Sequence, residues 1–143
     1  MKLGIAPDVE GGGFTPGAPW LGLARDAKHR TVCDQDTDPR SVLNFCRALL
    51  RLRHATAALH QGSFRVIEAH PDVLAYLRQS GGEAVMVTLN MSDRIVPAAL
   101  TDDAGRGWQV VLSSTGRRPG PVERAGLELG PLEAVVFQRN PLA

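Results

Sequence analysis

From residue 62 onward the sequence is a succession of short apolar segments separated by residues that favour turns, and this pattern most constrains the fold. Turn-forming groups such as His70-Pro71-Asp72 and Ser80-Gly81-Gly82 are short enough for antiparallel hairpins. We therefore expect residues 62–143 to form an antiparallel β-sandwich of about seven strands. The expected strands are Ser63 to Ala69, Val73 to Gln79, Ala84 to Leu89, Arg94 to Leu100, Trp108 to Ser113, Gly126 to Leu129 and Leu132 to Gln138.

Two of these segments carry information about their place in the sheet. Ala84 to Leu89 is apolar at nearly every position, which indicates a strand buried on both faces and therefore central. Pro97 has no backbone N–H to donate, so its strand is expected at an edge or at a bulge.

Residues 38–61 are predicted to form one long helix. Asp38 can cap its first turn, and Pro39 fits the first helical position. Apolar residues then recur at helical spacing, at Val42, Leu43, Phe45, Cys46, Leu49, Leu50 and Leu52. This stripe covers about half of the helix circumference, against the roughly 100° of an ordinary core-facing stripe. The apolar surface of the helix is thus wide enough to contact two neighbouring elements.

The segment 1–37 is rich in Gly and Pro and has no sustained apolar period, so it is predicted to be an extended arm or loop. The complete fold class is then α+β and mostly β, with an arm, one long helix and a β-sandwich. A chain of 143 residues and 15.3 kDa has room for one domain, alone or with such an arm.

Composition excludes some classes of function. The net charge is +1, from 16 basic and 15 acidic residues, so no excess charge attracts nucleic acid or an anionic membrane. The sequence reaches Pro7 and two acidic residues before any apolar run, and we predict neither a signal peptide nor a membrane span. A cytoplasmic location is the resulting expectation. Cys33 and Cys46 are predicted to be free thiols, with Cys46 a small core residue.

No motif for a metal or a cofactor is found. The acids of Asp34-Gln35-Asp36-Thr37-Asp38 lack the glycine and the later glutamate of a calcium loop, and they fit a helix N-terminus instead. His29, Cys33 and Cys46 lack zinc-ligand spacing. Gly11-Gly12-Gly13 has neither a preceding strand nor a following helix, as a phosphate cradle would require.

No catalytic residue is predicted either. Ser41, Ser113 and Ser114 have no histidine or other base at an interpretable spacing, so a nucleophile triad is unsupported.

Several segments, taken in order, resemble one known family. Gly12-Gly13-Phe14-Thr15-Pro16-Gly17-Ala18-Pro19-Trp20-Leu21 is similar to the loop after the last barrel strands of α-glucosidases and oligo-1,6-glucosidases in glycoside hydrolase family 13. Residues 32–35 and 38–53 resemble the lead-in and final barrel helix of that family. Gly62-Ser63-Phe64 and residues 72–78, 85–93 and 129–137 resemble its C-terminal β-domain.

The resemblance implies a parent fold with a (β/α)₈ barrel, of which this chain keeps the last loop, the last helix and the appended β-domain. The family's nucleophilic Asp, its Glu acid/base and its stabilising Asp come from earlier barrel strands, and no residue here matches them. The chain alone is therefore expected not to be an enzyme. Phe14 and Trp20, in the loop that the family places near the active-site mouth, are the candidates for sugar contact, with ordinary packing as the alternative.

We expect a fragment of this kind to self-associate, because the wide apolar stripe of its helix lacks one of the two surfaces that would cover it. We expect a homodimer through the helix or the arm, with Val42, Phe45, Leu49, Leu52 and Arg53 as the contact face. Arg53 either pairs across that interface or meets carbonyls at the end of its own helix. The alternative function is a stand-alone carbohydrate-binding or regulatory module for α-glucans. Such a module needs exposed aromatic side chains, and only 5% of the residues are aromatic.

Overall fold

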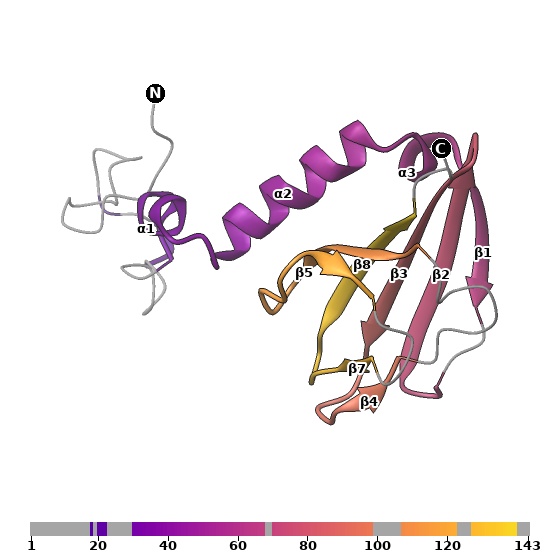
Figure 1. Cartoon of the computed structure of the whole chain (residues 1–143). Helices are drawn as coiled ribbons and strands as arrows, with labels where there is room; N and C mark the ends of the chain where they lie inside the picture. Colours follow the sequence, from indigo (N-terminus) through magenta and orange to yellow (C-terminus); the bar gives the residue numbers. More distant parts are fainter. Residues whose placement is uncertain are drawn as a thin grey trace. The chain divides into compact units, whose positions relative to one another are not determined.

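The structure is a computed structural model that describes residues 18, 20–22, 30–67, 70–98, 107–122 and 127–139. The chain divides into two units, Met1–Arg47 and Ala48–Ala143. Figure 1 shows a helical segment followed by an antiparallel sheet, so the expected mostly-β fold class is confirmed. No helix in the described part of the chain is long and apolar enough to cross a membrane.

Helix α1 (Val32–Thr37) lies within the segment predicted to be an extended arm. The reason is a local cap. The Thr31 hydroxyl accepts a hydrogen bond from the Asp34 backbone N–H at 3.1 Å and donates to the Asp34 carboxylate at 2.6 Å. This reciprocal pairing across one turn is a variant of the capping box, and six residues are enough to complete the helix.

Helix α2 (Val42–Ala55) begins later than predicted, because its cap is Ser41 and not Asp38. The Ser41 hydroxyl accepts from the Asn44 N–H at 3.2 Å, the geometry of an N-cap. Asp38 instead accepts from the Arg40 N–H at 2.9 Å and closes a turn. The Asn44 amide lies 2.8 Å from the Gln35 carbonyl oxygen, and so joins the start of α2 to α1.

The predicted single helix over residues 38–61 is divided at Thr56, which is buried and extended (φ −117°, ψ 105°). A short helix, α3 (Ala57–Gln61), follows. No side-chain oxygen of Thr56 caps α3. Glu83 does so from a distant strand, accepting from the Ala58 N–H at 3.0 Å while its other oxygen accepts from Gln138 at 2.9 Å. The acid thus ties the helix to the sheet and meets the positive end of the helix dipole.

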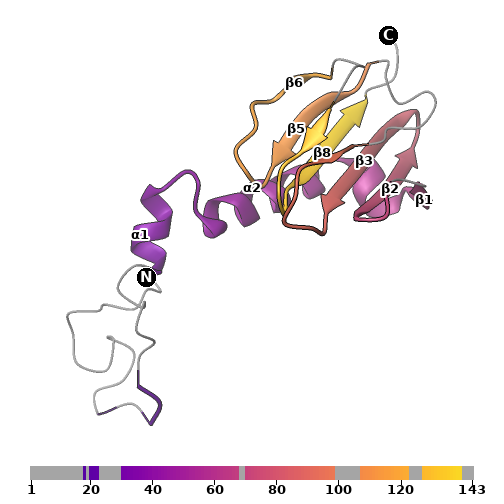
Figure 2. The same ribbon diagram turned by 90° about the horizontal axis from the view of Figure 1, so that it is seen from below.

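The described residues form a six-stranded antiparallel sheet in the order β1-β2-β3-β8-β5-β6 and a two-stranded sheet of β4 and β7 (Figures 1 and 2). Their bounds are β1 Ser63–Ile67, β2 Val73–Ser80, β3 Glu83–Asn90, β4 Val96–Pro97, β5 Gln109–Ser113, β6 Gly120–Pro121, β7 Glu128–Leu129 and β8 Ala134–Arg139. The short β6 was not predicted from the sequence.

Both positional predictions for the strands are confirmed. β3 lies inside the large sheet, and its residues from Ala84 to Thr88 are all buried. Pro97 lies in β4, which has β7 as its single neighbour in the described sheets. The turn between β2 and β3 uses Gly81 (φ 56°) and Gly82 (φ 86°), where positive φ at both residues matches the favoured two-residue hairpin.

Each face of the large sheet has its own apolar cluster. One face packs against the small sheet, through Leu77, Met86, Val110, Val135 and Phe137 on the large sheet and Val96, Ala98, Trp108 and Leu129 from the remainder. The other face carries Val85, Val87 and Val136, which pack with Ala58 of α3 and with Leu52 and Leu59. Because successive side chains along a strand point to opposite faces of the sheet, β3 contributes residues to both clusters.

Candidate functional site

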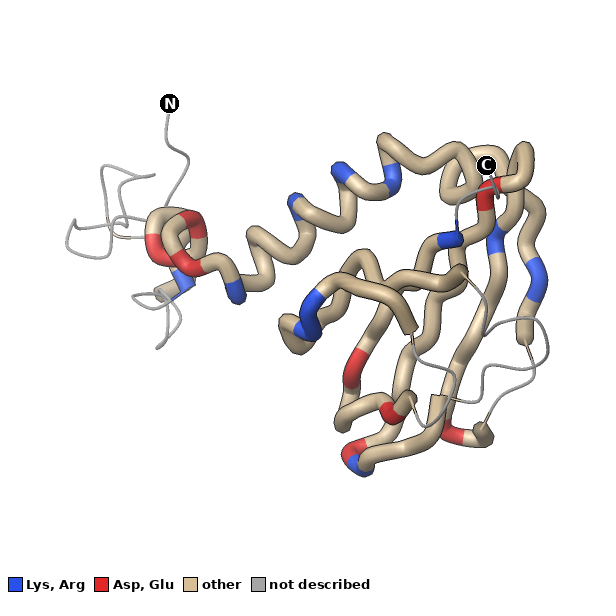
Figure 3. The backbone as a smooth tube through the Cα atoms, in the orientation of Figure 1, with Lys and Arg blue, Asp and Glu red and all other residues tan. Residues whose placement is uncertain are grey.

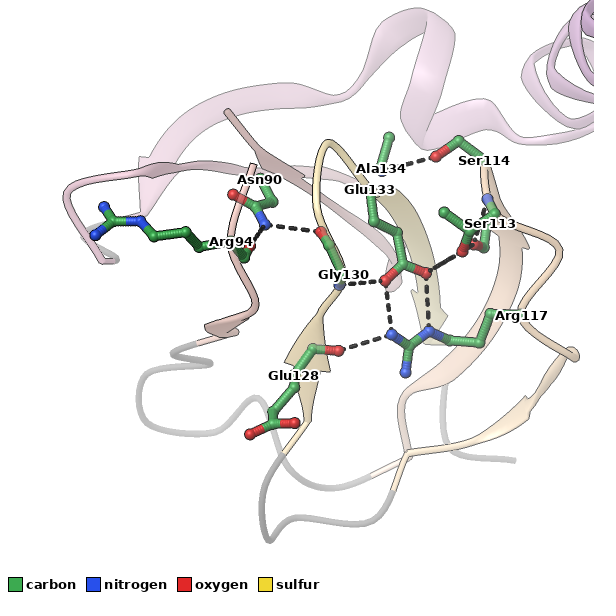
Figure 4. A network of polar contacts seen from close by, with 10 residues as sticks. Asn90, Arg94, Ser113, Ser114, Arg117, Glu128, Gly130, Glu133 and Ala134 are labelled. Carbon is green, nitrogen blue, oxygen red and sulfur yellow. Dashed lines mark hydrogen bonds and ion pairs between the residues drawn. The ribbon is translucent and has the colours of Figure 1, made fainter. Parts of the chain in front are cut away.

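A carboxylate is buried in the β-unit at Glu133, which precedes β8 and is 2% exposed. Arg117, from the segment after β5, binds it with two nitrogens, Nε to Oε1 at 3.0 Å and Nη2 to Oε2 at 2.7 Å. Figure 4 shows this paired arrangement. A planar guanidinium that donates twice to one carboxylate gives the strongest geometry available to an ion pair.

Three further donors complete the shell of Glu133. The hydroxyls of Ser113 and Thr115 donate to Oε1 at 2.9 and 2.7 Å, and the Gly130 N–H donates to Oε2 at 2.8 Å. Burial acts to raise the pKa of Glu133, but the hydrogen bonds from Arg117, Gly130, Thr115 and Ser113 outweigh it and lower the pKa to about 2. The carboxylate is therefore ionised at neutral pH.

The turn that presents Gly130 to Glu133 is itself held on its other side. Asn90 donates through its amide to the Gly130 carbonyl oxygen at 2.7 Å and to the Arg94 carbonyl oxygen at 2.6 Å (Figure 4). Between Gly130 and Glu133, Leu132 has φ 52°, a left-handed conformation that costs a leucine about 1 kcal/mol. Contacts on both sides of the turn maintain this strained residue.

The chemistry of this network is that of an anchor. Retaining glycoside hydrolysis uses two carboxyl groups about 5 to 5.5 Å apart, one of them able to give a proton. Glu133 is a single carboxylate surrounded by one cation, two hydroxyls and a backbone N–H, all donating to it. It joins the end of β5, the segment after β5, the β7–β8 turn and the start of β8.

Sequence reasoning missed this network, although one signal was present. Glu133 stands two residues before Val135 and four before Phe137, on the strand face that points into the core. An acid in register with buried apolar residues indicates a buried carboxylate with a partner. Arg117 gave no comparable signal, since it lies between strands in a polar segment.

Helix α2 presents a second candidate surface. None of its residues, all of which are described, is buried. Val42 is 72% exposed, Leu50 55% and Leu49 38%, while Phe45 is partly buried. Leu52, also predicted to lie in the contact face, packs partly against the sheet. Arg53 donates to the Leu59 carbonyl oxygen at 3.0 Å, so its head meets a carbonyl of the next helix.

The remaining predicted residues are not gathered into a site. Trp20 is 96% exposed, and Phe14 and His29 lie outside the described residues. Cys33 and Cys46 are free, as predicted, but Cys46 is exposed, so its assignment to the core is wrong. Among the described residues, no group of three His, Cys, Asp or Glu side chains could hold a metal ion.

Charge shows no dominant sign over the described chain. In Figure 3 basic positions follow one another along α2, and acidic positions gather on α1, while both signs are interspersed over the β-strands and their loops. Arg47 of α2 pairs with Asp36 of α1. This distribution accords with the net charge of +1.

Comparison with known proteins places these features in a family. Residues 64–136 match the family described as Maltogenic Amylase, C-terminal domain. The probable alpha-glucosidase of Rhizobium meliloti (strain 1021) is 39% identical over 82 residues, covering 57% of this chain and 15% of the relative. The oligo-1,6-glucosidase of Parageobacillus thermoglucosidasius is 29% identical over 132 residues, covering 92% of this chain and 24% of the relative.

A solved structure agrees with the sequence relatives. The crystal structure of the trehalulose synthase MutB from Pseudomonas mesoacidophila MX-45 has a TM-score of 0.76 at 31% identity, over 89% of this chain and 23% of that chain. This chain thus spans about a quarter or less of the length of each of these three relatives. It belongs to the maltogenic amylase C-terminal domain family and corresponds to the C-terminal part of a glycoside hydrolase family 13 protein of the α-glucosidase and oligo-1,6-glucosidase type.

Proposed function

We propose that this chain is a non-catalytic accessory part of an α-glucosidase-like glycoside hydrolase, and that it supports a catalytic barrel supplied by further polypeptide. The observation that carries the proposal is its coverage. The chain aligns over 92% of its length with an enzyme of which it represents 24%. The exposed apolar side chains of α2 support it, because a helix with no buried residue needs a partner to cover it.

Glu133 supports the same assignment. Its carboxylate is held ionised by five hydrogen bonds from four residues, which suits a rigid support and not a group that transfers protons. Its pKa of about 2 is far from the value near neutral pH that an acid catalyst requires.

The direct test is an assay of the purified chain with p-nitrophenyl α-glucoside. We expect no release of p-nitrophenol above that of a buffer blank. Turnover that survives rigorous purification and is lost on substitution of a residue of this chain would contradict the proposal. A substitution that leaves the residual rate unchanged identifies a contaminating hydrolase instead.

For the chain in isolation we propose a homodimer through the predicted helical face. The exposure of Val42 and Leu49 supports it, since each large aliphatic side chain removed from water contributes about 1.5 to 3 kcal/mol. Light scattering at micromolar concentration should give twice the monomer mass. The double variant Val42→Ser, Leu49→Ser should give the monomer mass. A monomer for the unmodified chain contradicts the dimer.

A carbohydrate-binding role has weaker support. Trp108, one of two tryptophans, is 4% exposed, and the Arg139 guanidinium carbon lies 5.1 Å from the centroid of its ring. A buried ring with a cation on its face cannot stack on a sugar.

For location we propose the cytoplasm, because two exposed and unpaired cysteines suit a reducing compartment.

A further inference from the structure

Two histidines lie in contact at the junction between helices α2 and α3. The ring centroids of His54 and His60 are 5.9 Å apart, and the two ring planes are tilted by 58°. His54 stands in the last turn of α2 and His60 in the last turn of α3, on either side of the break at Thr56. Both residues are exposed, and both belong to the unit that contains the sheet. We call them the histidine pair.

The spacing of the histidine pair fits a shared metal ion. An ion bound by an imidazole nitrogen at about 2.0 to 2.1 Å lies about 3.2 Å from the centre of that ring. Two rings on one ion therefore have centres about 5.2 Å apart at a tetrahedral angle, and at most about 6.4 Å apart. The observed 5.9 Å lies within this maximum. Rotation of two exposed side chains is enough to reach the tetrahedral value, without movement of either helix.

Contacts on both sides of the break hold the histidine pair in place. Arg53 donates to the Leu59 carbonyl oxygen at 3.0 Å, and this bond joins the end of α2 to α3. Ala58 of α3 is 0% exposed, and its N–H donates to the Glu83 carboxylate at 3.0 Å. The fold therefore fixes the backbone that carries both imidazoles, so that less conformational freedom is lost when an ion is bound.

The ends of the two helices favour a cation over an anion. The last turn of a helix carries carbonyl groups without an intrahelical partner and the negative end of the helix dipole. Both members of the histidine pair stand in such a turn. Arg51 and Arg53 lie within one turn of His54 and reduce the attraction for a divalent cation, while Glu83 brings a negative charge to the start of α3. The expected affinity is therefore modest.

We propose that His54 and His60 together bind one Zn²⁺ ion, or a divalent transition metal of the same class, with water in the remaining positions. Neutral imidazole is a preferred ligand of zinc, copper and nickel, whereas magnesium and calcium select oxygen ligands. Two protein ligands are fewer than catalytic and structural zinc sites use, so binding is reversible. The bound ion joins the last turns of α2 and α3, and it stabilises the helix break at Thr56 that no side chain of Thr56 caps.

Isothermal titration of the full chain with Zn²⁺ tests the proposal. All samples carry Cys33→Ser and Cys46→Ser, because exposed thiols bind the same metals. This parent chain is compared with His54→Gln, with His60→Gln and with the matched control His70→Gln, which removes a histidine just before β2. We expect one ion per parent chain with a Kd below about 1 mM, a Kd at least about tenfold higher for either junction variant, and an unchanged Kd for the control.

Shared and independent binding by the two imidazoles give different results. If they act separately, each substitution removes one weakly bound ion and leaves the Kd of the other unchanged, which overturns the proposal. A parent chain that does not saturate with one ion by about 1 mM Zn²⁺ overturns it as well.

Thermal unfolding followed by circular dichroism gives a second readout. Zn²⁺ should raise the melting temperature of the parent chain, because an ion that binds the folded chain shifts the folding equilibrium. The double variant His54→Gln, His60→Gln should melt at the same temperature with and without Zn²⁺. An equal shift in the parent and the double variant places the ion elsewhere and overturns the proposal. The proposed accessory function stands or falls separately, since none of these measurements involves a catalytic barrel.

Discussion

Replacement of Glu133 by Gln tests whether the buried network anchors the β-unit. The substitution keeps the size of the side chain but removes its charge and one of its two acceptor oxygens. Five hydrogen bonds now meet at the carboxylate, and a single amide oxygen cannot accept them all. Arg117 is left without its counter-ion. Breaking a buried ion pair from one side costs about 3 to 5 kcal/mol, which is the loss in unfolding free energy that we expect at pH 7.

The stabilisation that Glu133 contributes depends on pH. The carboxyl of Glu133 has a pKa of about 2 in the folded chain against an ordinary value of 4.5, so between these values the unfolded chain binds more protons. The stabilisation is complete above about pH 5 and is lost as the pH falls toward 2. The difference of about 2.5 pKa units corresponds to about 3 kcal/mol. The difference in unfolding free energy between the unmodified chain and the Glu133→Gln variant should therefore decrease as the pH falls from about 5 toward 2.

Urea denaturation followed by circular dichroism at pH 7, 5, 4 and 3 measures both effects. Glu128→Gln is the matched control, because Glu128 is exposed and contributes only its backbone carbonyl to the network. We expect this control to stay within about 0.5 kcal/mol of the unmodified chain. The anchoring role of Glu133 is contradicted if the Glu133→Gln chain is as stable as the control at pH 7, or if the difference in unfolding free energy between the unmodified chain and Glu133→Gln does not change with pH.

Three further substitutions test how the helices are built and attached. Gly62→Ala should lower the unfolding free energy by about 2 kcal/mol or more, because the new Cβ would lie 2.3 Å from the Ala58 carbonyl oxygen; an unchanged melting temperature contradicts it. Ser41→Ala should cost about 1 kcal/mol and reduce helical ellipticity, whereas the cap predicted from sequence would leave both unchanged. Glu83→Ala should expose the start of α3, and hydrogen exchange at the Ala58 amide should quicken; exchange at the unmodified rate rejects the cap.

The sequence predicted the β-unit well, because period-2 alternation and turn residues are local signals. Ser80-Gly81-Gly82 marked the hairpin between β2 and β3, and the apolar run from Ala84 marked a strand buried on both faces. The short strand β6 was not predicted, because a strand of two residues has no alternation that could be detected. Its place depends on pairing with β5, which is a long-range contact.

The helical boundaries were less accurate, because two capping residues compete over a few positions. Asp38 and Ser41 both favour a cap, and the choice depends on which side chain reaches an N–H at the start of α2. The break at Thr56 had no local signal, since Glu83 supplies the missing cap from 25 residues away along the chain. Residues in contact only through the tertiary fold cannot be found from spacing.

The most direct measurement of the accessory role uses a chimera. The quarter of the Parageobacillus thermoglucosidasius oligo-1,6-glucosidase that matches this chain is either deleted or replaced by this chain, and the thermal midpoint of activity loss is compared. We expect deletion to lower the midpoint sharply or to abolish soluble enzyme, and replacement to restore most of the midpoint. A truncated enzyme as active and as heat-stable as the intact one would contradict the accessory role.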